Sequence, residues 1–193
     1  MTDKSNVLVE LKDVKKEFVT AKTFMGKPLK TVHAVDQVNL SIYEGETIGV
    51  VGESGCGKST LGRVILHLLD STDGQIFFEG EDITKARGKK MSHLRGDMQI
   101  VFQDPYASLD PRKTVSQIIA EPLIIQGKLS KTEIEQKVSQ MLDTVGLAKR
   151  VANSYPHELD GGRRQRIGIG RALILRPKFI ICDEPVSALD VSI

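Results

Sequence analysis

A glycine-rich octapeptide at residues 52–59, "GESGCGKS", has the spacing G-x-x-x-x-G-K-[ST] of a phosphate-binding loop. Glycines let successive backbone N–H groups converge on phosphates, and a helix that follows directs its positive end toward them. An apolar run precedes the loop and a helical pattern follows it, which disfavours the alternative of a chance glycine-rich turn. We therefore predict nucleotide binding by the loop residues Gly52, Glu53, Ser54, Gly55, Cys56, Gly57, Lys58, Ser59 and Thr60.

Two side chains of this loop have separate expected tasks. Lys58 is expected to reach the β- and γ-phosphates of the nucleotide, because its long side chain carries a positive charge. The hydroxyl of Ser59 is expected to ligate Mg²⁺.

Acidic and amide side chains follow two further apolar runs. The run "KFIICDEP" at 178–185 contains Asp183 and Glu184, and the run "MQIVF" at 98–102 is followed by Gln103. In a parallel α/β core, ligands bind at the carboxyl ends of strands, so we expect Asp183 and Gln103 to hold Mg²⁺ beside the phosphate loop. Glu184 is expected to orient or deprotonate a water, with Gln103 contacting that water. The alternative is a solvated turn at 183–185 and an ordinary polar strand end at Gln103.

The hydrophobic pattern predicts the elements that position these residues. A loop is expected at 20–31 and a helix at 59–69. The clearest helix covers 130–145, where Ser130 and Glu133 have capping-box spacing and Gly146 suits the residue after the helix end. Strands are expected at 7–11, 38–43, 46–51, 75–78, 98–102 and 178–182.

Composition excludes several protein classes. The chain has 193 residues and a net charge of +2, which gives little support for binding nucleic acid by charge alone. Its start does not have the pattern of a secretory signal, and no apolar stretch approaches a membrane span. Cys56 and Cys182 lack metal-ligand spacing and are expected to be reduced thiols of a cytoplasmic protein.

Four spaced motifs together resemble the ATP-binding cassette family. They are the phosphate loop, Gln103, the segment "HELDGGRRQRIGIGRALI" from residue 157 and the segment "IICDEPVSALD" that ends at Asp190. The double-glycine segment resembles the family's signature, formed here by Asp160, Gly161, Gly162 and Arg163, and Asp190 lies in the segment that resembles its D-loop.

The resemblance implies an α/β fold: a P-loop NTPase (RecA-like) core with an N-terminal antiparallel β layer, a helical insert, and its C-terminal core strands missing. Three parts are expected. Residues 1–103 form the β layer and the first part of the nucleotide-binding core, and residues 104–160 form a helical signature subdomain. Residues 161–193 form the signature helix, the strand before Asp183 and the D-loop of an incomplete core.

The resemblance also implies ATP and Mg²⁺ as ligands and a mechanism in which two cassettes close head to tail around two ATP molecules. The segment "FQDPYASLDPRKTV" at 102–115 resembles ATPases of bacterial peptide and nickel importers, with di- or oligopeptide uptake the first choice. The expected partners are a second, related but non-identical ATPase chain, two membrane permease subunits and, indirectly, a peptide-binding protein. The expected location is the cytoplasmic face of the membrane. Phe18 is a candidate for the aromatic that stacks on adenine, and a buried core phenylalanine is the alternative.

The signature departs from the family's usual leucine, serine, glycine, glycine, glutamine. Asp160 stands at the serine and Arg163 at the glutamine. Aspartate is a good N-cap, so one interpretation is that Asp160 only starts a helix. The resemblance, however, implies that this position faces the partner's γ-phosphate, where like charges repel. We therefore hypothesise slow or absent hydrolysis of the ATP that this signature completes.

The sequence leaves three further interpretations open. None of His33, His67, His93 or His157 occupies the place of the family's γ-phosphate histidine, and the chain is interpreted as a fragment or truncated product. The second interpretation is a regulatory cassette that binds ATP without hydrolysing it. A DNA-repair ATPase is the third, although the arginines at 163, 164, 166 and 171 are more typical of a solvated face or a phosphate-side patch.

Overall fold

The computed structural model describes residues 6–22 and 28–184 of the chain. These residues form two compact units, which divide between Ser92 and His93. The three-part division at residues 103 and 160 stays a prediction. None of the helices in the described ranges combines the length and apolar character that a membrane crossing requires.

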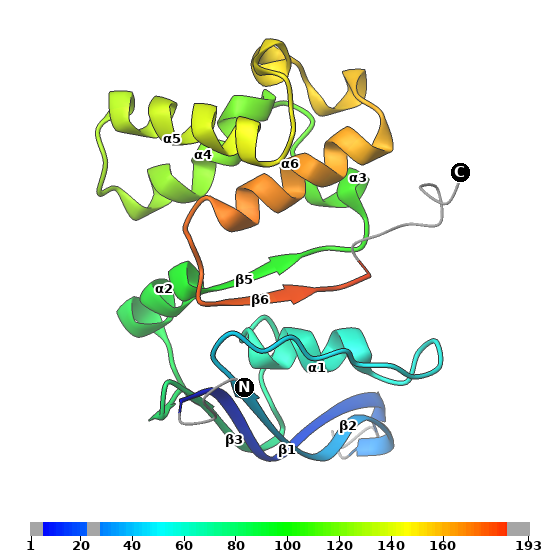
Figure 1. Cartoon of the computed structure of the whole chain (residues 1–193). Helices are drawn as coiled ribbons and strands as arrows, with labels where there is room; N and C mark the ends of the chain where they lie inside the picture. Colours follow the sequence, from blue (N-terminus) through cyan, green and yellow to red (C-terminus); the bar gives the residue numbers. More distant parts are fainter. Residues whose placement is uncertain (1–5, 23–27, 185–193) are drawn as a thin grey trace. The chain divides into compact units, whose positions relative to one another are not determined.

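The first unit contains a four-stranded antiparallel sheet in the order β2-β1-β3-β4 and one helix, α1, which contacts β1 and β2 (Figure 1). Valine and isoleucine at alternating positions suit these strands, because their branched side chains pack well on a pleated surface. The elements of this sheet and its helix are β1 (Val7–Lys22), β2 (Pro28–Tyr43), α1 (Lys58–Ile65), β3 (Asp73–Phe78) and β4 (Glu81–Asp82).

The two longest strands correct the predicted loop at 20–31. β1 continues to Lys22 and β2 begins at Pro28, so residues 20–22 and 28–31 belong to strands. Their ladder has several irregularities between Val7 and Lys22, which is why the sequence shows no sustained alternation over its whole length.

The predicted strand at 46–51 is also wrong. None of its residues is assigned to a strand, and Val51 is 93% exposed. A strand requires a neighbour that accepts and donates its ladder hydrogen bonds, and within the described residues no such pairing exists for this segment. Residues 46–51 are thus an apolar segment without a partner strand in the described part of the chain, and the local pattern alone does not make them a strand.

The predicted helix at 59–69 ends earlier than expected. α1 stops at Ile65, and His67 follows with a left-handed φ of 52°. The backbone N–H groups of Leu68 and Leu69 both donate to the carbonyl of Arg63, at 2.9 and 3.1 Å, and this satisfies the end of the helix.

The second unit combines a parallel two-stranded sheet, β5 and β6, with a group of helices (Figure 1). The strands predicted at 98–102 and 178–182 are confirmed, and they pair with Met98 opposite Phe179 and Val101 opposite Cys182. The elements of this unit, apart from α2 (Gly88–Asp97), which crosses the division, are β5 (Met98–Val101), α3 (Pro105–Ser108), α4 (Val115–Gln126), α5 (Lys131–Thr144), the 3₁₀ helices η1 (Lys149–Asn153) and η2 (Pro156–Glu158), α6 (Gly161–Leu173) and β6 (Phe179–Cys182).

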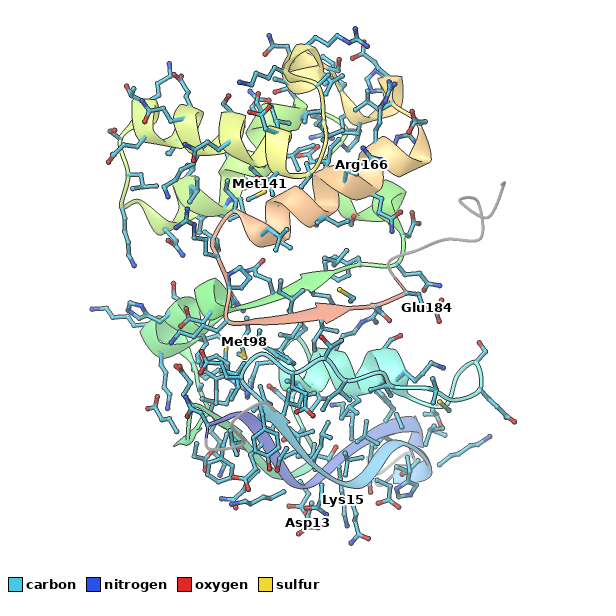
Figure 2. All side chains as sticks on the ribbon, viewed as in Figure 1. Asp13, Lys15, Met98, Met141, Arg166 and Glu184 are labelled. Carbon is cyan, nitrogen blue, oxygen red and sulfur yellow. The ribbon has the colours of Figure 1, made fainter. Side chains whose placement is uncertain are left out.

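The core of the second unit lies among α4, α5 and α6. It is entirely apolar at its most buried positions, which include Val115, Ile119 and Ile167, all fully enclosed. Met141 on α5 packs against this core at the point where α5 faces α6 (Figure 2). Burial of an aliphatic side chain of this size contributes about 1.5–3 kcal/mol, so this cluster accounts for the stability of the helices.

The capping boxes show why these helices begin where they do. At α5, the Ser130 hydroxyl accepts from the backbone N–H of Glu133, whose carboxylate accepts from the backbone N–H of Ser130 at 2.8 Å. The helix predicted at 130–145 and its cap are thereby confirmed, and Gly146 has the left-handed φ of 67° expected after the helix end. Thr114 and Gln117 form the same box at the start of α4.

Replacing Gly168 by alanine should raise the thermal midpoint of unfolding by about 1–4 °C. Gly168 lies in the middle of α6, where an added Cβ would meet no atom within 4 Å, and glycine costs a helix interior about 0.5–1 kcal/mol relative to alanine. The matched control is Gly127→Ala at the end of α4, where φ is 62° and alanine is strained, so the midpoint should fall. Calorimetry on both variants checks the opposite signs, and a fall for Gly168→Ala would contradict the expectation.

Candidate functional site

The phosphate loop is a tight turn at the start of α1. The backbone N–H of Cys56 donates to the carbonyl of Glu53 at 3.3 Å, and Gly55 and Gly57 have left-handed φ angles of 79° and 100°. A Cβ on Gly57 would lie only 2.0 Å from the carbonyl oxygen of Ala34 on β2, so only glycine fits there. The phosphate loop thus lies directly against strand β2 of the sheet.

The charged end of Lys58 lies inside the loop. Its Nζ donates to the carbonyls of Gly52 and Glu53, at 2.8 and 2.7 Å, and to the Cys56 Sγ at 3.7 Å. No side chain caps α1 at Gly57. The loop therefore presents an ammonium group and the positive end of a helix, which together suit a polyphosphate.

Gln103 and Glu184 meet at the carboxyl ends of the parallel pair β5 and β6. The Gln103 Nε2 donates to the Glu184 Oε2, although 81 positions separate the two residues. The backbone N–H of Asp183 donates to the Val101 carbonyl at 3.0 Å, which fixes the turn after β6. Glu184, which lies just past β6 in Figure 2, has a left-handed φ of 45°, an uncommon conformation for a residue with a side chain.

The structure brings together only some of the predicted site residues. Lys58 and Ser59 belong to the first unit, whereas Gln103, Asp183 and Glu184 belong to the second, so the expected approach of these two sets stays a prediction. Asp190 lies outside the described residues. The described residues contain no cluster of three or more His, Cys, Asp or Glu side chains that could hold a metal.

The side chains predicted to bind a metal suit Mg²⁺ better than a metal whose ligands all come from the protein. Mg²⁺ keeps several waters and is held by one or two carboxylates together with substrate phosphates. The hydroxyl of Ser59, the amide of Gln103 and the carboxylate of Asp183 are oxygen donors of the type that Mg²⁺ prefers, and their meeting at one site stays a prediction.

Phe18 lies on β1 and is 37% exposed, so the alternative of a buried core phenylalanine is wrong. The Lys16 Nζ lies 5.1 Å from the centre of its ring. Val19 and Val32 beside it are also exposed, at 47% and 45%. An accessible aromatic ring is thus present on this strand, and its stacking on adenine stays a prediction.

The signature segment begins α6. Asp160 is the N-cap residue, and its Oδ1 accepts from the backbone N–H of Arg163 at 2.8 Å. That N–H lowers the pKa of the Asp160 carboxyl, with smaller contributions from the charges of Arg163 and Arg166. The carboxylate is therefore ionised at neutral pH. The structure confirms that Asp160 caps α6, and its approach to a partner's phosphate stays a prediction.

Two arginines of α6 contradict the prediction of a solvated arginine face. Arg164 is 8% exposed, and its Nε donates to the Pro156 carbonyl at 2.5 Å. Arg171 donates to the Ser108 carbonyl at 2.6 Å, and desolvation lowers its pKa. Positions 164 and 171 lie two helical turns apart on the face that also carries Ile167, and this spacing is the signal that would have placed them inward.

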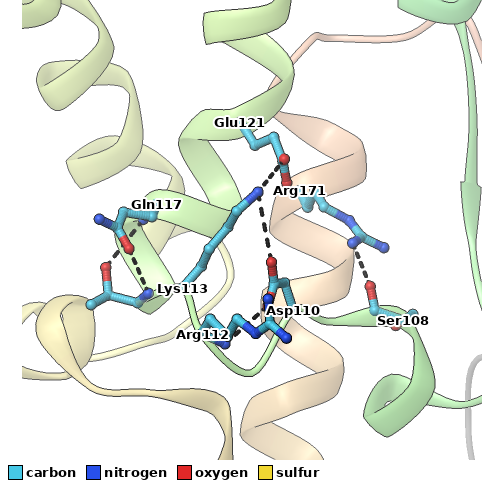
Figure 3. Close-up of polar contacts among 8 residues, drawn as sticks. Ser108, Asp110, Arg112, Lys113, Gln117, Glu121 and Arg171 are labelled. Atoms are coloured by element: carbon cyan, nitrogen blue, oxygen red, sulfur yellow. Dashed lines mark hydrogen bonds and ion pairs between the residues drawn. The ribbon is translucent and has the colours of Figure 1, made fainter.

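Figure 3 shows how these contacts tie the segment after Gln103 to the helices. Arg171 on α6 holds Ser108 at the end of α3, and Lys113 pairs with Glu121 on α4 and with Asp110, the latter at 4.0 Å. The segment between β5 and α4 is thus fixed near its middle and at its end before α4 by charge-assisted contacts, which the local sequence pattern does not predict.

A separate cavity of about 930 Å³ lies in the first unit. Residues between Asp70 and Lys90 line it, and no residue of the phosphate loop contributes to it. Since its three acidic and three basic side chains balance each other, it has no preference for an anion such as a nucleotide.

Comparison with known proteins gives concordant results. The model of the ABC transporter family matches residues 35–187. The oligopeptide transport ATP-binding protein OppF of Bacillus subtilis (strain 168) is 56% identical over 197 residues, which cover 100% of this chain and 61% of that protein. OppF of Escherichia coli (strain K12) is 51% identical over 196 residues, with 100% of this chain and 59% of that protein covered.

A solved structure has the same fold. It is the dimeric, post-hydrolysis state of the ATP-binding cassette MJ0796 bound to ADP and Pi, with a TM-score of 0.84 and 32% identity over 95% of this chain and 77% of that chain. The chain spans about three fifths of the length of the curated relatives that it matches. The mixed α/β fold of a P-loop NTPase is thereby confirmed, and the chain belongs to the ABC transporter family.

Proposed function

We propose that this chain is the ATP-binding part of a subunit that energises the import of di- or oligopeptides through a membrane transporter. The observation that carries nucleotide binding is the phosphate loop, where Gly57 packs on Ala34 and Lys58 lies across the turn. The peptide substrate is supported by the names of the OppF relatives and by the segment at 102–115.

In this proposal Lys58 and the N–H groups at the start of α1 bind the β- and γ-phosphates of ATP. Lys58 then exchanges its carbonyl partners in the loop for phosphate oxygens, which are stronger acceptors for an ammonium group. Phe18 offers its ring to the adenine. Mg²⁺, held by Ser59, Gln103 and Asp183, would neutralise charge on the phosphates.

Glu184 orients the attacking water and accepts its proton, and Gln103 holds the Glu184 carboxylate in place by the contact seen here. Asp160, Gly161, Gly162 and Arg163 contact the nucleotide of a partner cassette, and Asp190 lies at the same junction. The proposed partner cassette is a related, non-identical chain. Two membrane subunits and an extracytoplasmic peptide-binding protein complete the assembly, with this chain on the cytoplasmic side.

A second candidate is a cassette that binds ATP without hydrolysing it. The ionised carboxylate of Asp160 favours this candidate, because it stands at the signature position where a phosphate is expected. Both candidates share nucleotide binding and differ in turnover.

The test is transport by the full-length protein, reconstituted with its partner subunits in vesicles that contain ATP. Uptake of a labelled tetrapeptide should require ATP inside the vesicles and the peptide-binding protein outside. Uptake of a nickel complex, with no uptake of the peptide, would show that nickel and not a peptide is the substrate. ATP-dependent uptake of neither compound would contradict the proposal of import.

A further inference from the structure

The start of α6 holds two residues whose charges are joined by a double contact. Asp160 accepts from the backbone N–H of Arg163 at 2.8 Å through Oδ1, and its Oδ2 lies 3.2 Å from the Arg163 Nε. One residue thus satisfies both oxygens of the carboxylate, with its backbone on one side and its guanidinium on the other. The side chains remain 61% and 50% exposed.

The two contacts have different consequences for the charge. The backbone contact is that of an ordinary N-cap and would be equally available to asparagine or serine. The guanidinium contact is needed only because the cap carries a charge, since neutral caps gain little from a cation beside them. The ion pair of Arg163 therefore depends on an aspartate, and not merely on an N-cap residue, at position 160.

The other arginines of α6 provide less of this compensation, because none of them contacts the Asp160 carboxylate in the described part of the chain. Arg164 is directed into the unit, toward the carbonyls of Pro156 and His157. Arg166 donates to the carbonyl of Gly146 at 3.0 Å, at the end of α5. Arg163 is consequently the α6 arginine that forms an ion pair with Asp160 within the described part of the chain.

We propose that Arg163 is a positioning residue that makes Asp160 compatible with a phosphate at the signature. It holds the carboxylate against the first turn of α6 and cancels its charge, so that the segment presents to the partner's nucleotide what a neutral serine presents in other cassettes. This inference rests on the proposed function, because it takes the signature to face a nucleotide. The proposal also weakens the argument for the second candidate, the cassette that binds ATP without hydrolysing it. That argument takes Asp160 to repel ATP, and Asp160 does not do so while Arg163 is present.

The pair can be separated by substitutions that keep the helix start intact. Asp160→Asn removes the charge and keeps the N-cap hydrogen bond, since asparagine caps helices as well as aspartate does. Arg163→Gln removes the guanidinium and leaves the backbone N–H in place. Arg166→Gln is the matched control, because it removes a positive charge from the same helix without touching the ion pair.

The experiment measures the ATP-dependent association of the full-length protein with its partner cassette by analytical ultracentrifugation, for the wild type, Asp160→Asn, Arg163→Gln, the double variant and Arg166→Gln. Arg163→Gln should raise the dissociation constant about threefold to tenfold, because it leaves an uncompensated carboxylate beside the phosphate. The double variant should return to within about twofold of the wild type. Arg166→Gln should have a smaller effect, because Arg166 donates to the Gly146 carbonyl and forms no ion pair with Asp160.

Failure of rescue, with the double variant as weak as Arg163→Gln, would overturn the proposal, because a merely structural arginine would not depend on the charge at 160. Strictly additive effects would overturn it as well. Nucleotide binding to the isolated subunit is measured in parallel with Lys58→Ala as reference. Absence of binding by the wild type would refute the proposed function itself, whereas intact binding and association without rescue would refute only the role of Arg163.

Discussion

Lys58→Ala should weaken the binding of a fluorescent ATP analogue, with Mg²⁺ present, by about 10- to 100-fold. The ammonium group lies inside the phosphate loop, bonded to the carbonyls of Gly52 and Glu53 at 2.8 and 2.7 Å. A charge-assisted hydrogen bond of this type contributes about 1.5–3 kcal/mol, which corresponds to the stated loss in affinity. Direct titration of the nucleotide into both proteins gives the comparison.

Lys85→Ala is the matched control for this loss. Lys85 is an exposed lysine of the same unit and lies outside the phosphate loop, so its removal changes the net charge equally. Equal affinities for the wild type and Lys58→Ala would refute the assignment of the loop. Circular dichroism of Lys58→Ala separates a lost contact from a lost fold, because Lys58 also holds the loop carbonyls together.

Glu184→Gln should lower the rate of ATP hydrolysis by about 10²- to 10⁴-fold while leaving nucleotide binding intact. The substitution removes the proton acceptor and keeps the size of the side chain. The contact with Gln103 survives, because the amide oxygen of glutamine also accepts from the Gln103 Nε2. Turnover and affinity should therefore separate in this variant, measured on the full-length protein with its partner cassette.

Glu135→Gln on α5 serves as the control, because Glu135 is exposed and only 4.0 Å from Lys131, at the limit of an ion pair. Unchanged turnover in Glu184→Gln would exclude Glu184 as the base. No turnover in either protein, with nucleotide still bound, would support the second candidate, a cassette that holds ATP without hydrolysing it.

Local signals in the sequence were enough for several elements. The α5 helix was predicted closely, because its cap, its apolar stripe and the glycine after its end all lie within about 17 neighbouring residues. The β5 and β6 strands followed from short apolar runs with polar ends. The glycine spacing of the phosphate loop likewise needed no tertiary information.

Elements that depend on distant partners were predicted less well. The run at 46–51 looked like a strand, but strand formation depends on a neighbour that periodicity does not supply. The long β1 and β2 strands were underestimated because the irregularities of their ladder disturb the alternation of side chains. In both cases the missing information was the partner backbone.

The candidate site was only partly predictable for the same reason. Sequence position indicated Gln103 and Glu184 as strand-end residues, and the structure adds the contact between them. The inward direction of Arg164 and Arg171 was missed, because arginine is seldom buried and composition favoured a solvated face. The carbonyls of Pro156 and Ser108 that receive them come from turns whose location depends on the folded chain.

The pairing of β5 with β6 has a consequence for the order in which the protein folds. The α4–α5 hairpin has its own caps and local contacts, so it can form early, within a short stretch of chain. The parallel pair instead joins residues separated by about eighty positions, and the contact between Gln103 and Glu184 spans 81. A loop of this length closes slowly. During synthesis α4 and α5 are therefore expected to form before Gln103 and Glu184 meet. The helical part of the nascent chain is then folded before the residues proposed for hydrolysis are in place.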